Sequence, residues 1–458
     1  MTHPSDSKLH IALFPWLATG HFTPFLHLAN QFAIRGHKVS YLLPRKPMLL
    51  LQPRNLFPDL ITFHLVSVPH VEGLPLGTEN LSDVTPSLGN FVRVAFDSMR
   101  DQVENLLREL KPSIVFYDLA FWIPECAASI GFKTVCYNVV SAASIAIALV
   151  PAREIPKNRA LTAEDLMEPP TGYPSSTVVL RKHEALSLLF LYRRSDDGGV
   201  SMYDRIGLSF KGANAIAIRT CNELEGPFCN YLSSQFQKPV FVTGPILPEK
   251  DEETLIEDKL VGWLGKFKAG TVIYCAFGSE LNLEKPQFQE LVLGFEKAGF
   301  PFLIALKPPT GACSIEEALP EGFSERVKER GVIVKWVQQT QILKHKSIGC
   351  FVSHCGFGSM WESLMSNCQI VLVPFLGDQI LNTRVLCEVL KVAVEVEKDD
   401  NGWFSKESLS NAITSAMDKD GELGCLMRKN HAYWKETLMK PEFMSNYVDN
   451  FISQLYQL

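Results

Sequence analysis

The residues with the clearest chemistry lie in one window of the chain, from Trp336 to Gln379. It opens on an indole, a flat surface on which a planar base can stack. Further on, His354 and Ser359 flank two glycines between an apolar run and a helix expected to begin near Met360. Such a turn offers backbone N–H groups and side-chain donors to a phosphate. The window therefore predicts a site for a planar, phosphorylated ligand.

Three further residues of the window are suited to binding hydroxyl groups. Glu362, about one helical turn after Ser359, can accept two hydrogen bonds from a diol such as a ribose. Asp378 and Gln379 follow a second apolar strand and are expected on a loop at its carboxyl end, where open α/β sheets bind ligands. Each residue alone has a plainer explanation, since a tryptophan is usually core and an Asp-Gln after proline is usually a turn.

The order and spacing of these residues resemble the plant secondary-product glycosyltransferase box of family 1 UDP-glycosyltransferases. The resemblance implies a UDP-sugar donor, with no other cofactor and no metal. It implies that Trp336 and the Val337 backbone bind the base and that Gln339 and Glu362 bind the ribose. The diphosphate would be bound by His354, Gly356, Phe357, Gly358 and Ser359, and the sugar by Asp378 and Gln379. It also places Ser279, in the segment YCAFGSE, in a phosphate-contacting loop.

Two departures from the family pattern stand out. Where most members have Trp-Asn before the serine, this chain has Phe357-Gly358, which removes a side-chain donor near the phosphate and sugar. The window also opens with Trp-Val-Gln-Gln in place of Trp-Ala-Pro-Gln. The change at Val337 is expected to be mild, because the family uses a backbone group there.

The amino-terminal half supplies a candidate base. His21 lies where a first strand, Lys8 to Pro15, gives way to a helix, and Asp118 directly follows the strand 113–117. Imidazole suits proton removal from a hydroxyl near neutral pH, and a carboxylate on its other nitrogen fixes the tautomer. Taken alone, His21 could be a solvated side chain and Asp118 a cap. The family's catalytic dyad falls on these two positions, which implies an inverting transfer with His21 as base.

Three aromatic residues adjoin these positions: Trp16, Phe121 and Trp122. They could stack on a phenolic ring or a sugar face of the acceptor, or they could pack in the core. The segments PWLATGHFTPFLHLAN, VPHVEGLPLGTE, VVLRKHEA, ALKPP and HCGFGSMWES resemble the branch of the family that adds a sugar to a sugar of a flavonoid, anthocyanin or other phenolic glycoside. Similar members of that branch use UDP-glucose, UDP-rhamnose or UDP-xylose, and Gln379 favours a hexose.

Alternating strands and helices place these groups on parallel sheets. Strands are expected near 38–43, 133–137, 214–218 and 239–242 in the first half, and near 271–277, 302–306, 331–334, 348–352 and 370–373 in the second. Prolines and charges after Val242 suggest a linker. Residues 153–205 are expected to form loops and short helices that could shape the acceptor pocket. We expect an α/β protein with two doubly wound, Rossmann-like domains, 1–245 for the acceptor and 246–440 for the donor, and a helix in 441–458 packing back on the first. The resemblance implies the GT-B fold, with a cleft between the domains.

Composition agrees with a large soluble enzyme. The 458 residues are 46% apolar and 21% charged, enough for two cores. A net charge of −6 without a basic stripe argues against nucleic-acid binding. The eleven cysteines form no regular framework, and no stretch suggests a signal peptide or membrane span, so we expect a cytoplasmic protein. The oligomeric state stays open.

Three other functions would share part of this sequence pattern. A nicotinamide-dependent oxidoreductase should carry GxGxxG after an early strand, where this chain has ATGHFTP. A non-catalytic nucleotide-sugar-binding protein would keep the box but would not need both His21 and Asp118. Within the enzyme class, the alternative is a transferase that acts directly on an aglycone hydroxyl.

Overall fold

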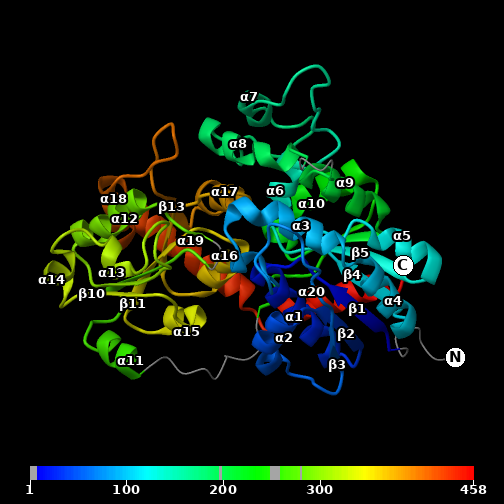
Figure 1. Ribbon diagram of the computed structural model, residues 1–458. Coiled ribbons are helices and arrows are strands. Elements are labelled where there is room, and N and C mark those ends of the chain that lie inside the picture. Colours follow the sequence, from blue (N-terminus) through cyan, green and yellow to red (C-terminus); the bar gives the residue numbers. More distant parts are fainter. Residues whose placement is uncertain (1–7, 195–198, 248–257, 279–280) are drawn as a thin grey trace.

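The computed structural model describes residues 8–194, 199–247, 258–278 and 281–458. These residues form two α/β halves that lie side by side, each built on a parallel sheet (Figure 1). Within the described residues, the first sheet has seven strands in the order β3-β2-β1-β4-β5-β6-β7 and the second has six in the order β10-β9-β8-β11-β12-β13. Neighbouring strands pair in parallel throughout both sheets. The expected doubly wound architecture is confirmed.

The strands are short apolar runs, as expected where helices cover both faces of a parallel sheet. Those of the first half are β1 (His10–Phe14), β2 (Lys38–Leu43), β3 (Ile61–Leu65), β4 (Ile114–Tyr117), β5 (Lys133–Asn138), β6 (Ala215–Ile218) and β7 (Val240–Val242). Those of the second are β8 (Val272–Ala276), β9 (Phe302–Ala305), β10 (Gly331–Val334), β11 (Ile348–Ser353), β12 (Gln369–Leu372) and β13 (Ala393–Glu395). The sequence did not predict β3 and β13, which form sheet edges.

Helices connect the strands and flank both sheets (Figure 1). Those of the first half are α1 (Thr19–Ile34), α2 (Arg45–Leu51), α3 (Gly89–Asp97), α4 (Arg100–Leu110), α5 (Ile123–Ile130), α6 (Ala142–Ala148), α7 (Ala163–Met167), α8 (Lys182–Leu188), α9 (Met202–Gly212) and α10 (Asn222–Phe236). They continue with α11 (Asp258–Leu264), α12 (Lys285–Ala298), α13 (Ile315–Ala318), α14 (Phe323–Val327), α15 (Gln339–Lys344), α16 (Phe357–Met365), α17 (Asp378–Arg384), α18 (Lys406–Met417), α19 (Glu422–Leu438) and α20 (Phe443–Leu455). None of the described helices is long and apolar enough to cross a membrane.

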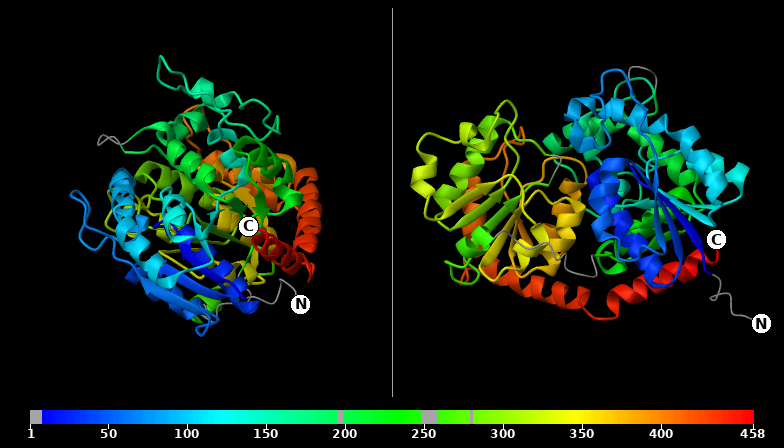
Figure 2. Two further views of the ribbon diagram at one scale, coloured as in Figure 1. Left: turned by 90° about the vertical axis from the view of Figure 1, so that its right-hand side faces the viewer. Right: turned by 60° about the horizontal axis from the view of Figure 1, so that its bottom comes forward.

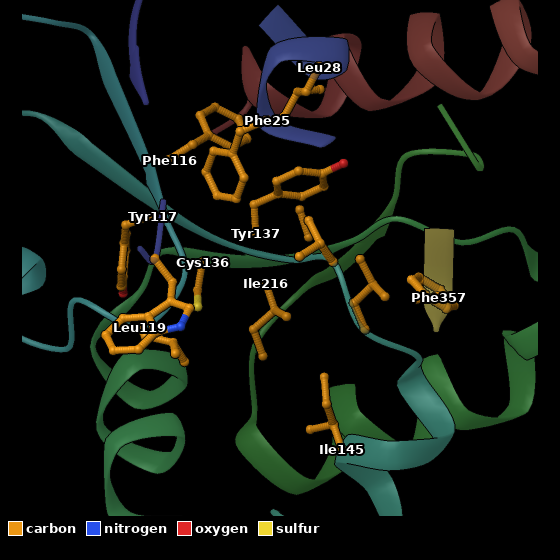
Figure 3. Packing of buried hydrophobic residues seen from close by; sticks show 14 of the residues in the cluster. Phe25, Leu28, Phe116, Tyr117, Leu119, Cys136, Tyr137, Ile145, Ile216 and Phe357 are labelled. Atoms are coloured by element: carbon orange, nitrogen blue, oxygen red, sulfur yellow. The ribbon is translucent and has the colours of Figure 1, made fainter. Parts of the chain in front are cut away.

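One apolar cluster extends from the first half into the second. It contains the core of the first sheet, with Ile145 and Ile216, and also the buried faces of α16 and α17. Phe357, the first residue of α16, lies in this cluster together with residues of the first half (Figure 3). Two further clusters fill the remainder of the second half. The halves are therefore joined by shared apolar packing as well as by the chain.

The end of the chain returns to the first half. Helices α19 and α20 run from the second sheet to the first (Figure 2, right). Phe451 of α20 packs against Phe32 of α1, Phe116 of β4 and Phe241 of β7, with ring centroids 6.0 to 6.2 Å apart. Arg35 Nε also donates to Asp449 Oδ1 at 2.6 Å. The last helix thus completes the packing of the first half.

The strand orders define where ligands are expected. In the first sheet the direction of winding reverses between β1 and β4, and in the second between β8 and β11. Loops that leave the carboxyl ends of such strand pairs run to opposite faces, which opens a crevice for ligands. The candidate residues follow β1, β4, β8 and β11, so both reversals are occupied by predicted site residues.

Candidate active site

His21 and Asp118 meet at the reversal point of the first sheet. Phe14 at the end of β1 pairs with Tyr117 at the end of β4, so the residues after them start from the same edge. Asp118 follows β4 directly, and His21 lies in the first turn of α1. The His21 Nδ1 and Asp118 Oδ2 atoms are 2.5 Å apart. Two residues almost a hundred positions apart are thus brought into direct contact.

The carboxylate of Asp118 is held firmly. Its Oδ1 atom accepts hydrogen bonds from the backbone N–H groups of Trp16, at 2.8 Å, and Leu119, at 2.6 Å. Its side chain is 3% exposed, whereas that of His21 is 21% exposed. An ionised carboxylate only accepts hydrogen bonds, so the proton on the imidazole resides on Nδ1 and leaves Nε2 as the basic nitrogen. The pair therefore has the geometry of an oriented general base.

The three aromatic candidates near this pair lie mainly in the core. Trp16 is 5% exposed and packs edge-on against Phe96, with centroids 5.0 Å apart. Trp122 is 2% exposed and packs against Phe14 at 5.8 Å. The guanidinium of Arg205 lies over the ring of Phe121, 4.8 Å from the ring centroid. Apolar packing thus occupies the rings of Trp16 and Trp122, which favours the core alternative for these two residues.

His354 sits between two glycines at the reversal point of the second sheet. It follows β11, and Gly356 is the N-cap of α16 without a side-chain cap bond. A Cβ atom at Gly278 or Gly356 would stand 3.0 or 2.7 Å from His354 Nε2. Burial lowers the pKa of His354 to about 4, so its imidazole is neutral at pH 7. The group can donate a hydrogen bond to a phosphate oxygen without carrying a charge.

The other residues around this turn differ in which of their groups can face a ligand. Ser279 lies outside the described residues. Phe357 is 4% exposed and packs against Trp361, with centroids 5.9 Å apart, so its ring belongs to the core and only its backbone can face a ligand. A Cβ atom at Gly358 would meet nothing within 4 Å, so the position of the family's asparagine is open space here.

The residues expected at the nucleoside come from the loop before α15, from α15 itself and from α16. Trp336 is 68% exposed, and it is followed by Val337, which is partly buried against the adjoining core. Gln339 Nε2 donates to Glu362 Oε2 at 2.6 Å and to Ser359 Oγ at 3.1 Å. Three polar residues of the window thus contact one another, and the indole that precedes them in the chain is exposed, which suits a base with its ribose.

Asp378 and Gln379 occupy the first turn of α17 instead of the expected loop. The helix begins there because Gln379 Oε1 accepts the backbone N–H groups of Phe375, at 3.0 Å, and Leu376, at 3.3 Å, which folds the preceding loop onto it. Asn382, which the sequence analysis missed, donates through Nδ2 to Asp378 Oδ2 and to the Cys355 carbonyl, both at 2.9 Å. Its spacing of one helical turn from Asp378 was the available signal. Asn382 connects α17 to the turn between β11 and α16.

The described residues contain no group of three or more His, Cys, Asp or Glu side chains arranged to hold a metal ion.

Known proteins resemble the chain over nearly its whole length. The family model "UDP-glucoronosyl and UDP-glucosyl transferase" matches residues 313–433. The anthocyanidin 3-O-glucoside 2'''-O-xylosyltransferase of Arabidopsis thaliana is 52% identical over 458 residues, covering 99% of this chain and 98% of the relative. UDP-glycosyltransferase 79B9 of the same plant is 53% identical over 455 residues, with 98% of each chain covered.

Solved structures share the fold. Arabidopsis thaliana UGT89C1 complexed with UDP-L-rhamnose matches with a TM-score of 0.76 at 21% identity, covering 98% of this chain and 100% of that one. TcCGT1 in complex with UDP matches with a TM-score of 0.80 at 21% identity, covering 98% and 99%. At this identity the likeness shows the fold alone, and it confirms the expected GT-B pair of doubly wound domains.

Proposed function

The chain belongs to the UDP-glycosyltransferase family and is a UDP-sugar-dependent glycosyltransferase, and from that premise we propose that it adds a sugar, with inversion, to a sugar hydroxyl of a phenolic glycoside. The observation that supports catalysis is the 2.5 Å contact between His21 Nδ1 and the buried Asp118 carboxylate. The acceptor class is inferred from the 52% identical relative, whose name describes transfer to an anthocyanidin glucoside.

His21 acts as the general base. Its Nε2 takes the proton of the acceptor hydroxyl while that oxygen bonds to the anomeric carbon of the donor sugar. The bond from that carbon to the phosphate oxygen breaks on the opposite face, and UDP leaves with the electron pair, so the anomeric configuration inverts. Asp118 stays ionised and stabilises the imidazolium through Nδ1–H. This assigns the two residues different parts of one proton transfer.

The second half binds the donor. Trp336 stacks on the uracil, and Gln339 with Glu362 binds the ribose, in keeping with their contact beside the exposed indole. Neutral His354 and the first N–H groups of α16 stabilise the departing diphosphate without a metal ion. Asp378 and Gln379 bind the sugar hydroxyls from the start of α17. UDP-glucose, UDP-rhamnose and UDP-xylose are the donors to be compared.

The domain limits and the compartment are also proposals. We place the acceptor domain at 1–245, the donor domain at 246–440 and the returning segment at 441–458, which the separate sheets and the position of α20 support. All eleven cysteines lie in the described part of the chain and are free thiols. Free, mostly buried thiols favour the reducing cytoplasm.

The test is transfer by the purified protein. Each of the three UDP-sugars would be incubated with a panel of flavonoid and phenylpropanoid glucosides and with their aglycones, alongside His21→Ala, and products would be identified by mass spectrometry. A product with two linked sugars that is absent from the variant supports the proposal, and NMR of its new linkage reads the anomeric configuration. Transfer to aglycones alone would refute the acceptor class, and tight UDP-sugar binding without any product would refute catalysis.

A further inference from the structure

Four charged side chains form a closed ring between the two halves. Arg181 and Glu184, at the start of α8, belong to the first half, and Arg384 of α17 and Glu395 of β13 belong to the second. Arg181 donates two parallel hydrogen bonds to Glu395, both at 3.0 Å. Arg384 donates through Nη1 to Glu395 at 2.5 Å and through Nη2 to Glu184. We call these four residues the interdomain ion ring.

The inner side of the ring is removed from water. The side chains of Glu184 and Arg384 are each 4% exposed and that of Glu395 is 11% exposed, whereas Arg181 is 49% exposed. Burying an ion pair costs solvation that the attraction barely offsets, so such pairs contribute little net stability. Their directional hydrogen bonds do specify one arrangement of the parts they join. The ring therefore defines where α17 lies relative to the first half.

The ring is connected to the proposed sugar-binding residues through one short helix. Arg384 is the last residue of α17, and Asp378 and Gln379 are its first two. The loop before them is held from the loop after β13, where Lys398 Nζ donates to the Pro374 carbonyl and lies 4.9 Å from the centroid of the Phe375 ring. A shift of α17 along or about its axis would move both sugar-binding residues together.

We propose that Glu184, which comes from the acceptor half, is a positioning residue for the sugar of the donor. It acts through Arg384, whose guanidinium it fixes, and α17 transmits that position to Asp378 and Gln379. The proposal rests on the proposed function, because it assumes that these two residues bind the donor sugar. It also gives a role to the segment VVLRKHEA, in which Arg181 and Glu184 lie far from the donor box in sequence.

Apolar packing is the alternative explanation for the position of α17. The apolar face of α17 also packs on α6 of the first half, with Ile380 and Leu381 fully buried. If that packing alone fixes the position of α17, the interdomain ion ring is not needed for binding of the donor. The two explanations differ in what they predict for sugar binding compared with nucleotide binding, because the residues proposed for UDP lie on α15, on α16 and in the loops that precede these helices.

The experiment compares Glu184→Gln with the wild-type protein by calorimetric titration of UDP and of whichever donor, UDP-glucose, UDP-rhamnose or UDP-xylose, the wild-type protein transfers. The glutamine oxygen can keep the bond that Glu184 Oε2 accepts from the Arg181 N–H, while its amide group opposes the Arg384 guanidinium. We expect the ratio of the Kd for the UDP-sugar to the Kd for UDP to rise about tenfold, a coupling typical of residues in one network. The Kd for UDP itself should stay unchanged.

Three further variants complete the design. Glu164→Gln removes an ion pair with Lys182 that spans 3.0 Å on the same segment, with both partners more than 60% exposed, and should leave the ratio unchanged. Arg181→Gln breaks the ring from its exposed side and should raise the ratio about threefold, which tests the proposal even if Glu184→Gln does not fold. Glu184→Asp, which keeps the charge, should restore part of the lost affinity.

An unchanged ratio in both ring variants would overturn the proposal, and so would an equal rise in the Kd values for UDP and UDP-sugar, which indicates a general loss of structure. Failure of the proposed function is distinguishable, because it would appear in the wild-type protein as an absence of UDP binding or of transfer.

Discussion

Replacing Asp118 by asparagine tests how the carboxylate supports catalysis. The Oδ1 position receives the N–H groups of Trp16 and Leu119, so the asparagine side-chain oxygen must take that place. Its amide group then faces His21 Nδ1 and donates to it. The imidazole proton moves to Nε2, the nitrogen that should accept the substrate proton. The variant should keep its shape but present the wrong tautomer.

The expected loss follows from that change of tautomer. A positioned general base accelerates proton transfer by about 10² to 10⁴-fold, so kcat should fall about 10³-fold, equivalent to about 4 kcal/mol. The KM for the UDP-sugar should change little, because the proposed donor residues lie in the other half. Since His21 and Asp118 act as one unit, the double variant Asp118→Asn/His21→Ala should be no slower than His21→Ala alone.

The assay is release of UDP under saturating donor and acceptor, with UDP titration to verify an intact donor site. A kcat within tenfold of the wild-type value would refute the tautomer argument. Losses that multiply in the double variant would show that the two residues act separately, and would also contradict it.

Three other outcomes follow from the site. Trp336→Ala should weaken UDP binding about 10- to 100-fold at nearly constant Tm, because the ring is 68% exposed and base stacking contributes about 1–3 kcal/mol; unchanged UDP titration would contradict this. Gly356→Ala should weaken UDP binding about tenfold by displacing His354, whereas Gly207→Ala in α9, which adds a methyl group in open space away from the site, should not, and equal effects would contradict the glycine argument. Burial lowers the pKa values of His27 and His354 to about 3 and 4, below their usual 6.5, so the unfolded chain takes up these protons first. The free energy of unfolding should therefore be at its full value above pH 6.5 and should fall as the pH drops toward 3, by about 3 kcal/mol for His354. A Tm that stays flat from pH 6.5 to 4 would contradict this expectation.

The strands show what a sequence can predict about this fold. Interior strands such as β8 and β11 are continuous buried runs and could be located from their apolar residues. Two edge strands could not. In β3, ITFHL, only Ile61 is buried, and β13 has three residues, one of them Glu395 of the ion ring. A strand covered on one side only carries a mixed pattern that resembles a loop.

The site divides along similar lines. The glycine turn before α16 and the contact between His21 and Asp118 could be predicted because each depends on a local strand-to-helix junction together with a family pattern. Phe357 shows where this fails, since its place in the turn is predictable but the direction of its ring is decided by the apolar cluster between the halves. The contact between Glu184 and Arg384 joins positions 200 residues apart, and no local pattern encodes it.

The return of α20 to the first sheet links the order of synthesis to folding. The phenylalanines of α1, β4 and β7 that surround Phe451 are all made before the second half begins. About 200 residues separate β7 from α20, which at about 5–20 residues per second leaves this apolar surface uncovered for about 10–40 s on the ribosome. The first domain to emerge is the last to be completed. Deleting the final 13-residue helix should therefore leave the nascent protein in that incomplete, aggregation-prone state permanently.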